Sequence, residues 1–241
     1  MSSAKTLRLA TEHDVAAITG LIDRTGRWLR TKGTDQWARP WPDAAARAAR
    51  IRAGLVHGRT LLVERGGELV GTVSMTSRGD PSLWRPHELL RPALYLHRLA
   101  VDRSEAGSAL GVRLLDWTTE WARLEYGAEC VRIDVWNDNA ALHAYYTRIG
   151  FTFVDPDPVT RQPRPRLDKR VRPSSVLLER RIAAASADWP SSAAFTLTPT
   201  IRTSLPHPAL RFRSPLRHRP SPWSLPTPPA PNNTTPPTLT H

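Results

Sequence analysis

The stretch with the clearest chemical character is a turn of small residues between two apolar segments. It reads Gly-Ser-Ala-Leu-Gly over 107–111, follows the apolar run Ala93–Val101 and opens an amphipathic segment at Leu110. Small side chains let a backbone approach a ligand closely, and the first N–H groups of a helix point outward without intrahelical partners. Because the helix dipole also attracts anions, the turn could bind a pyrophosphate. A glycine-rich helix start without a ligand is the alternative.

Several other kinds of site are excluded by the residues present. No Gly-Lys-Ser/Thr follows the turn, so it is not a Walker A loop, and the dinucleotide fingerprint G-x-G-x-x-G is absent. Cys130 is the single cysteine, which excludes an intrachain disulfide framework and any multi-cysteine zinc site. At the start of an alternating, strand-like run, it is expected to be a small buried residue and not a nucleophile.

A second stretch with candidate chemistry runs from Asn137 to Phe151. After Asn139 it contains two adjacent tyrosines, Tyr145 and Tyr146, and it ends at Gly150. On a helix, the apolar residues place Tyr145 on the buried face and Tyr146 beside it. The residues alone leave two roles open for Tyr146, packing or proton donation, and packing is the commoner role for a tyrosine pair on an amphipathic helix.

Strands and helices must hold these residues, and the hydrophobic pattern predicts both. Alternating or continuous apolar runs predict strands over 5–10, 60–64, 68–75, 93–101, 130–136, 151–155 and 175–181. Near-helical spacing predicts helices that begin after Thr11 and after Asp43, and further helices over 110–124 and 139–150. This order combines antiparallel and βαβ connections. It predicts an α/β fold in which a central mixed sheet is flanked by helices.

Both stretches, in this order and among these elements, resemble the GNAT superfamily of N-acetyltransferases over roughly residues 5–181. In that family an Arg/Gln-x-x-Gly-x-Gly/Ala loop after a splayed strand binds the pyrophosphate of acetyl-CoA. Here Gly107 and Ala109 match that loop, whereas Ser104 stands where Arg or Gln is usual. Arg103 and Arg113 flank the loop and could supply the missing charge. The cofactor contacts implied by the resemblance fall on Leu99, Ala100 and Val101 in the strand, on Gly107, Ser108, Ala109, Leu110 and Gly111 in the loop, and on Asn139 near the pantetheine arm.

The resemblance also implies catalytic roles. Tyr146, four residues before Gly150, is the expected general acid that protonates the departing CoA thiolate. A backbone N–H of the splayed strand, within 99–101, is expected to stabilise the thioester oxygen. Family members use Glu, His or water as the base. Here His97 is the candidate, although a lone strand histidine is more often structural; Glu64, Glu88 and Asp134 are weaker candidates.

The function expected from the resemblance is transfer of an acetyl group from acetyl-CoA to the amine of a small molecule, directly within a ternary complex and without a metal. A non-catalytic, CoA-binding regulatory or partner-binding module is the alternative, because Ser104 departs from the family pattern. The acceptor side is less defined. Trp28, Trp37 and Trp41 lie in or beside the loop after the first helix and could line the acceptor pocket or only hold that loop in place. Asp35 and Asp43 lie nearby and could attract an ammonium group.

Proline and charge are unevenly distributed along the chain. Residues 190–241 contain 13 of the 23 prolines, five arginines and no acidic residue. Such a composition is typical of disordered, extended chain. We therefore expect an acetyltransferase domain over residues 1–184 and a basic, disordered tail over 185–241. The net charge of +12 also raises a nucleic-acid-associated role, but no motif supports it, so no specific nucleic-acid partner is expected.

Features that would direct the chain to a membrane or out of the cell do not stand out. No run of 18 apolar residues occurs, and residues 1–14 have no apolar core of signal-peptide length. With a single cysteine, this composition predicts a soluble, cytoplasmic protein without a membrane partner. A homodimer is compatible with the sequence, which does not identify the acceptor amine.

Overall fold

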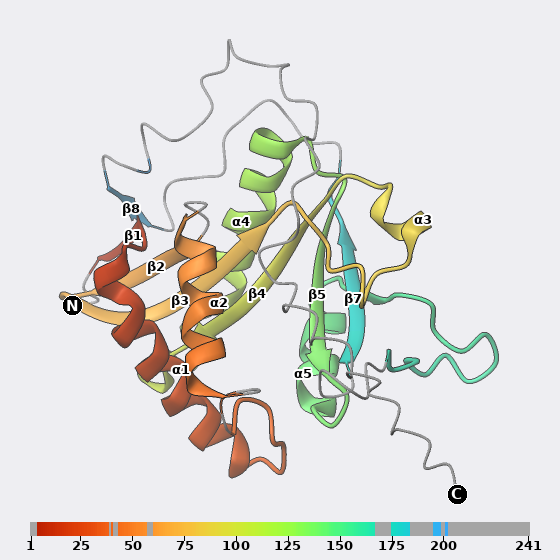
Figure 1. Ribbon diagram of the computed structural model, residues 1–241, viewed down its shortest axis with the longest axis horizontal. Coiled ribbons are helices and arrows are strands. Elements are labelled where there is room, and N and C mark those ends of the chain that lie inside the picture. The colour runs from red at the N-terminus through yellow and green to blue at the C-terminus, as the bar shows by residue number, and fades with distance from the viewer. Residues whose placement is uncertain are drawn as a thin grey trace, which may run out of the picture.

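A mixed β-sheet forms the centre of the computed structural model, which describes residues 4–38, 40, 43–56, 60–166, 175–183, 195–198 and 201. Its eight strands lie in the order β6-β7-β5-β4-β3-β2-β1-β8 (Figure 1). Two pairs, β4 with β5 and β1 with β8, are parallel, and the other neighbours are antiparallel. The strands are β1 (Lys5–Leu9), β2 (Thr60–Arg65), β3 (Glu68–Thr76), β4 (Ala93–Val101), β5 (Cys130–Trp136), β6 (Thr152–Phe153), β7 (Ser175–Arg181) and β8 (Thr196–Leu197).

Helices cover both faces of the sheet. The helices are α1 (Val15–Arg30), α2 (Ala44–Val56), the short α3 (Pro86–Leu89), α4 (Leu110–Tyr126) and α5 (Ala140–Arg148), with 3-10 turns η1 (Glu12–Asp14) and η2 (Arg103–Glu105). Figure 1 shows α1 and α2 in front of the sheet and α4 behind it. In the described part of the chain, none of the helices is both long and apolar enough to cross a membrane.

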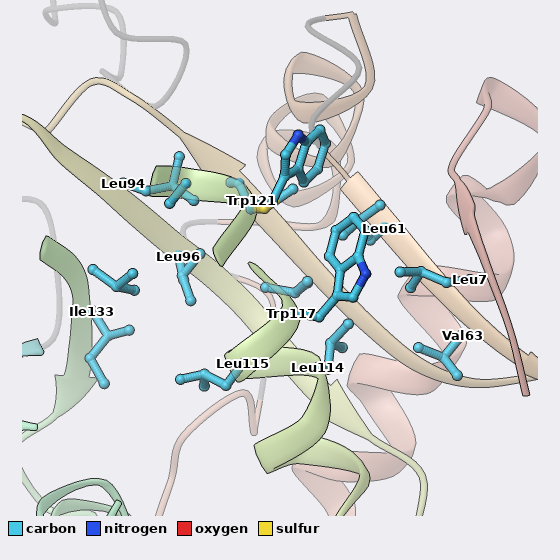
Figure 2. Close-up of a cluster of buried hydrophobic side chains, with 14 of the residues drawn as sticks. Leu7, Leu61, Val63, Leu94, Leu96, Leu114, Leu115, Trp117, Trp121 and Ile133 are labelled. Carbon is cyan, nitrogen blue, oxygen red and sulfur yellow. The ribbon is translucent and has the colours of Figure 1, made fainter. Parts of the chain in front are cut away.

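The main core lies between α4 and the sheet. The helical spacing of Leu114, Trp117 and Trp121 turns these side chains toward β-strand residues such as Leu61 and Leu96 (Figure 2). Trp121 is among the largest fully buried side chains of the described residues. A smaller core on the other face joins α1 and α2 to the sheet through Ile18, Ile22, Ile51 and Leu62.

The predicted fold class is confirmed, and each predicted strand and helix has a counterpart among the described elements. One segment differs from the expectation for the tail. Phe195, Leu197 and Ile201 are buried in the main core, and β8 pairs with β1 at the edge of the sheet. A few apolar side chains suffice for this packing. The overall composition of the tail, which is rich in proline, does not reveal them. The rest of the predicted tail lies outside the described residues, so the domain boundary at 184 remains a prediction.

Candidate active site

The site is built around a gap between two parallel strands. β4 and β5 pair from Ala93 to Leu96 and from Cys130 to Ile133. Beyond this point β4 continues along β3 to Val101, while β5 continues along β7 to Trp136. Figure 1 shows the two strands diverging toward the bottom of the view. The sheet therefore opens on the side where both strands end.

A β-bulge in β4 accompanies this opening. Ser74 of β3 pairs with His97 and Thr72 with Ala100, so two residues of β4, Arg98 and Leu99, lie opposite one residue of β3. Arg98 has a φ of 52°, the left-handed conformation that a bulge allows but a regular strand does not. Because a bulge bends its strand, it explains why β4 turns away from β5.

Beyond the bulge, one backbone amide of β4 points toward the gap. The N–H of Asp102 donates to the Val70 carbonyl of β3 at 2.9 Å. Backbone N–H groups of an antiparallel strand point alternately to its two sides. Beyond the bulge, the amide of Ala100 therefore also points toward β3, whereas that of Val101 points toward the gap. Of the three strand residues expected to contact the cofactor, Val101 has its amide on the side of the gap and Ala100 on the side of β3, while Leu99 lies in the bulge, where this alternation is interrupted.

The small-residue turn forms an exposed loop at the start of α4. Gly107 and Ala109 have positive φ angles of 78° and 55°, and no side chain caps the first turn of α4. Ser104, Gly107 and Ala109 are exposed. Amide groups at such a helix start can bind an anion. Ser104 donates its backbone N–H to Asp102 at 3.0 Å, and its short, uncharged side chain cannot supply the charge of the Arg often found at this position in the resembled family.

Arg103, expected to supply that missing charge, packs on the first helix. Its guanidinium lies 4.2 Å from the ring centre of Trp28. Next to it, Arg24 donates to Asp102 at 3.1 Å. The C-terminal half of α1 thus contacts the loop through two residues, and Trp28 packs against an arginine there.

Tyr146 is buried beside the open end of the sheet, whereas Tyr145, expected on the buried face, is only partly buried. The Tyr146 ring contacts the rings of Tyr145 and Phe151 edge to face, with centroids 5.3 Å apart in each case. Burial raises the pKa of Tyr146, and Tyr145 and Asp134 raise it further, so its hydroxyl is protonated at neutral pH. The hydroxyl of Tyr145 instead lies 3.3 Å from the position that a Cβ at Gly111 would take, at the start of α4.

Two of the four predicted base candidates meet at the gap. His97 Nδ1 lies 3.5 Å from Asp134 Oδ1, and both side chains are about one-fifth exposed. Glu64 accepts from Arg8 at 2.6 and 2.8 Å. Glu88 accepts from Arg166 at 2.6 Å. These last two carboxylates are held in ion pairs, which leaves His97 and Asp134 as the titratable pair at the opening.

Asn139 links the loop after α1 to the opening. It caps α5 by accepting from the Leu142 N–H at 3.1 Å, and its side-chain N–H donates to Gln36 at 2.7 Å. Thr34 and the Asp35 amide donate to Asp138 at 3.1 Å each. The loop after α1 is therefore fixed to the turn between β5 and α5. Gln36 and Asp138 did not stand out in the sequence, because nothing local indicates contacts about 100 residues apart.

The remaining candidates have structural surroundings. Trp37 packs in the smaller core, and Asp43 accepts from the Ala46 amide at the start of α2; Trp41 lies outside the described residues. Cys130 is buried, which raises the pKa of its thiol to about 12 and makes it a poor nucleophile. Across the described ranges, no three metal-ligating side chains cluster.

Comparison with known proteins gives one family and a common fold. The family model described as "Acetyltransferase (GNAT) family" matches residues 23–151. The uncharacterized N-acetyltransferase YesJ of Bacillus subtilis is 33% identical over 153 residues, which is 61% of this chain and 82% of YesJ. A GNAT-family acetyltransferase from Listeria monocytogenes superposes with a TM-score of 0.54 at 23% identity, over 74% of this chain and 95% of that one. PaiA N-acetyltransferase from Thermoplasma acidophilum, solved with coenzyme A, gives 0.51 at 12% identity, over 74% and 99%.

Proposed function

The chain belongs to the GNAT family of acetyltransferases, and from that premise we propose that it transfers the acetyl group of acetyl-CoA directly to the amine of a small molecule within a ternary complex. One observation carries the proposal. An uncapped, exposed helix start lies at the end of β4, on the side where β4 and β5 separate. A helix start of this kind can bind an anion, and its position beside the opening in the sheet supports the proposal. A structural relative solved with coenzyme A has the same fold.

The loop residues fit the diphosphate group of acetyl-CoA. When bound, acetyl-CoA would supply an activated thioester. The amides of Gly107–Gly111 are the expected donors, because the first turn of α4 has no side-chain cap. A Cβ built at Gly107 would meet no atom within 4 Å, so the loop is open to a ligand. Asn139 is expected beside the pantetheine arm, where its bond to Gln36 would fix the wall of the acceptor side.

The backbone of β4 can stabilise negative charge on the thioester oxygen. The amide of Val101 points toward the gap, since the amide of Asp102 donates to Val70 on the opposite side of β4. One oriented donor of this kind contributes about 10²–10³ in rate. Since this amide belongs to a strand that pairs with β3, little reorganisation is needed when charge develops.

Tyr146 is proposed as the general acid. Its raised pKa keeps the hydroxyl protonated, which is the state that can donate a proton to a departing thiolate. A positioned acid contributes about 10²–10⁴ in rate. Tyr145 is placed differently, with its hydroxyl at the start of α4.

His97 is proposed as the base that takes a proton from the acceptor amine. Imidazole can accept a proton near neutral pH. The carboxylate of Asp134, 3.5 Å away, would orient the ring and stabilise the imidazolium after proton transfer. This arrangement assigns Asp134 a positioning role and reserves contact with the substrate for His97.

The alternative is a module that binds CoA without catalysis, and Ser104 is the observation that favours it. Turnover distinguishes the two. Acetyl-CoA is incubated with a panel of primary amines, free thiol is followed, and products are identified by mass spectrometry. Transfer to at least one amine, slowed by Tyr146→Phe, supports the enzyme. CoA binding without turnover of any amine in the panel would favour the module.

A further inference from the structure

A buried carboxylate lies directly beneath the exposed loop. Glu105, at the end of η2, has a side chain only 1% exposed, whereas its neighbours Ser104 and Ala106 are exposed. Its Oε2 lies 3.2 Å from Lys5 Nζ, and its Oε1 lies 2.6 Å from Arg65 Nη1. An acidic residue is unexpected beside an anion-binding loop, so its position calls for a physical reason.

The two cations are themselves a cross-strand pair. Lys5 of β1 is the register partner of Arg65 in β2, so both side chains lie on the same face of the sheet. Like charges in that position repel each other. Glu105 reaches down from the loop and lies between them. Glu68, the β3 partner of Arg65, is exposed at the hairpin.

The ion pairs keep Glu105 charged despite its burial. Burial alone would raise the pKa of this carboxyl, but interactions with the Ser108 side chain, Lys5 and Arg65 outweigh it, and the pKa is lowered. Removing one partner from a buried charged group is costly because the others lose their compensation. The three side chains therefore act as one connected unit between the sheet and the loop.

Glu105 also shapes the loop through its backbone. Its N–H donates to Asp102 at 3.0 Å, and its carbonyl accepts from Ser108 at 3.1 Å. The next residues, Gly107 and Ala109, have the positive φ angles that aim the loop amides. Binding groups must be held within about 0.5 Å of their working geometry. A side-chain anchor at Glu105 thus fixes the position of amides two to six residues further on.

We infer that Glu105, clamped between Lys5 and Arg65, is a positioning residue that holds the phosphate-binding loop in its ligand-binding shape. The inference rests on the proposed function insofar as the ligand is the diphosphate of acetyl-CoA. Such an anchor attaches the loop to β1 and β2, and it does not use a side chain at position 104.

The negative charge of Glu105 and its positioning role lead to opposite predictions for CoA affinity, which allows a sharp test. Glu105→Gln removes a negative charge near an anion site, so electrostatics alone would tighten CoA binding. Loss of positioning instead weakens it, by roughly tenfold or more if it resembles the loss of outer residues that orient other binding sites. The affinity for CoA is measured by titration calorimetry on the full chain. The kcat at saturating acetyl-CoA is expected to stay unchanged. Glu68→Gln is the control, because it removes the same charge from the other neighbour of Arg65 and should leave CoA affinity unchanged.

Hydrogen exchange of amides 106–111 separates failure of this inference from failure of the proposed function. Faster exchange in Glu105→Gln than in the parent supports the anchor, even if the parent binds no CoA and the proposed function fails. Where the parent binds CoA, equal or tighter CoA binding by the folded variant would overturn the inference. Whether or not the parent binds CoA, unchanged exchange in those amides would overturn it. If Glu105→Gln does not fold, Lys5→Gln is tested instead, because Glu105 then keeps its ion pair with Arg65. Lys5→Gln should show the same weaker CoA binding and faster exchange, to a smaller degree. Unchanged exchange in Lys5→Gln would likewise overturn the inference.

Discussion

His97 and Asp134 face each other at the first position where β4 and β5 cease to pair, with Nδ1 and Oδ1 3.5 Å apart. If His97 is the base, His97→Gln should lower kcat/KM for the acceptor amine by about 10²-fold or more. Acetyl-CoA affinity should hold, because the loop is untouched. Asp134→Asn should cause a smaller loss, since it removes the group that orients the ring and stabilises its charge.

The pH profile distinguishes this role from a structural one. A base must be deprotonated to act, so kcat/KM of the parent should rise with pH on the acidic side. That rise should flatten in His97→Gln, whereas a variant that only loosens the fold would lower the whole curve. An unchanged profile in His97→Gln would exclude the base role and favour water.

Gly107 offers a test of the loop itself. Its φ of 78° strains any other residue, although a Cβ there would meet no atom within 4 Å. Gly107→Val should therefore weaken CoA binding strongly, because a β-branched residue forces the loop out of this conformation. Gly107→Ala should have a smaller effect, and thermal melting of both variants checks that the fold is intact. Unchanged CoA affinity in a folded Gly107→Val protein would count decisively against placing the diphosphate at this loop.

Local patterns predicted most of the fold and part of the site. The spacing of Leu114 and Trp117 predicts the buried face of α4, and the small residues near Gly107 predict an exposed helix start. The bulge at Arg98 could not be predicted, because it depends on how β3 and β4 pair. The contacts of Glu105 with Lys5 and of Asn139 with Gln36 join residues about 100 apart, and only the folded sheet brings them together.

The C-terminal segment is expected to contribute to stability, in contrast to the disordered tail that the composition predicts. Phe195, Leu197 and Ile201 are 4%, 8% and 1% exposed. Burying each such side chain contributes about 1.5–3 kcal/mol before chain entropy is subtracted. A chain ending at Ile182 should therefore melt at a lower temperature, by about 2–4 °C for each kcal/mol lost. A chain ending at Thr203 should match the full-length protein, and Leu197→Ser in the full chain should reproduce part of the loss. Equal melting of all four proteins would show that this packing contributes nothing to stability.

Tyr146 tests the chemistry most directly. Tyr146→Phe keeps the ring against Phe151 and Tyr145 and removes only the hydroxyl, so packing should barely change. If the hydroxyl acts in the transition state, kcat and kcat/KM should fall together by about 10²–10⁴-fold, while acetyl-CoA affinity holds. Because burial raises the pKa of Tyr146, the parent should not lose activity from this group before the ordinary tyrosine range near pH 10 is passed. Tyr145→Phe is the comparison, since its hydroxyl lies by Gly111 and its loss should alter acetyl-CoA affinity more than kcat. Equal rates for Tyr146→Phe and the parent, measured with chemistry rate-limiting, would remove the acid role from Tyr146 and assign protonation of the thiolate to solvent.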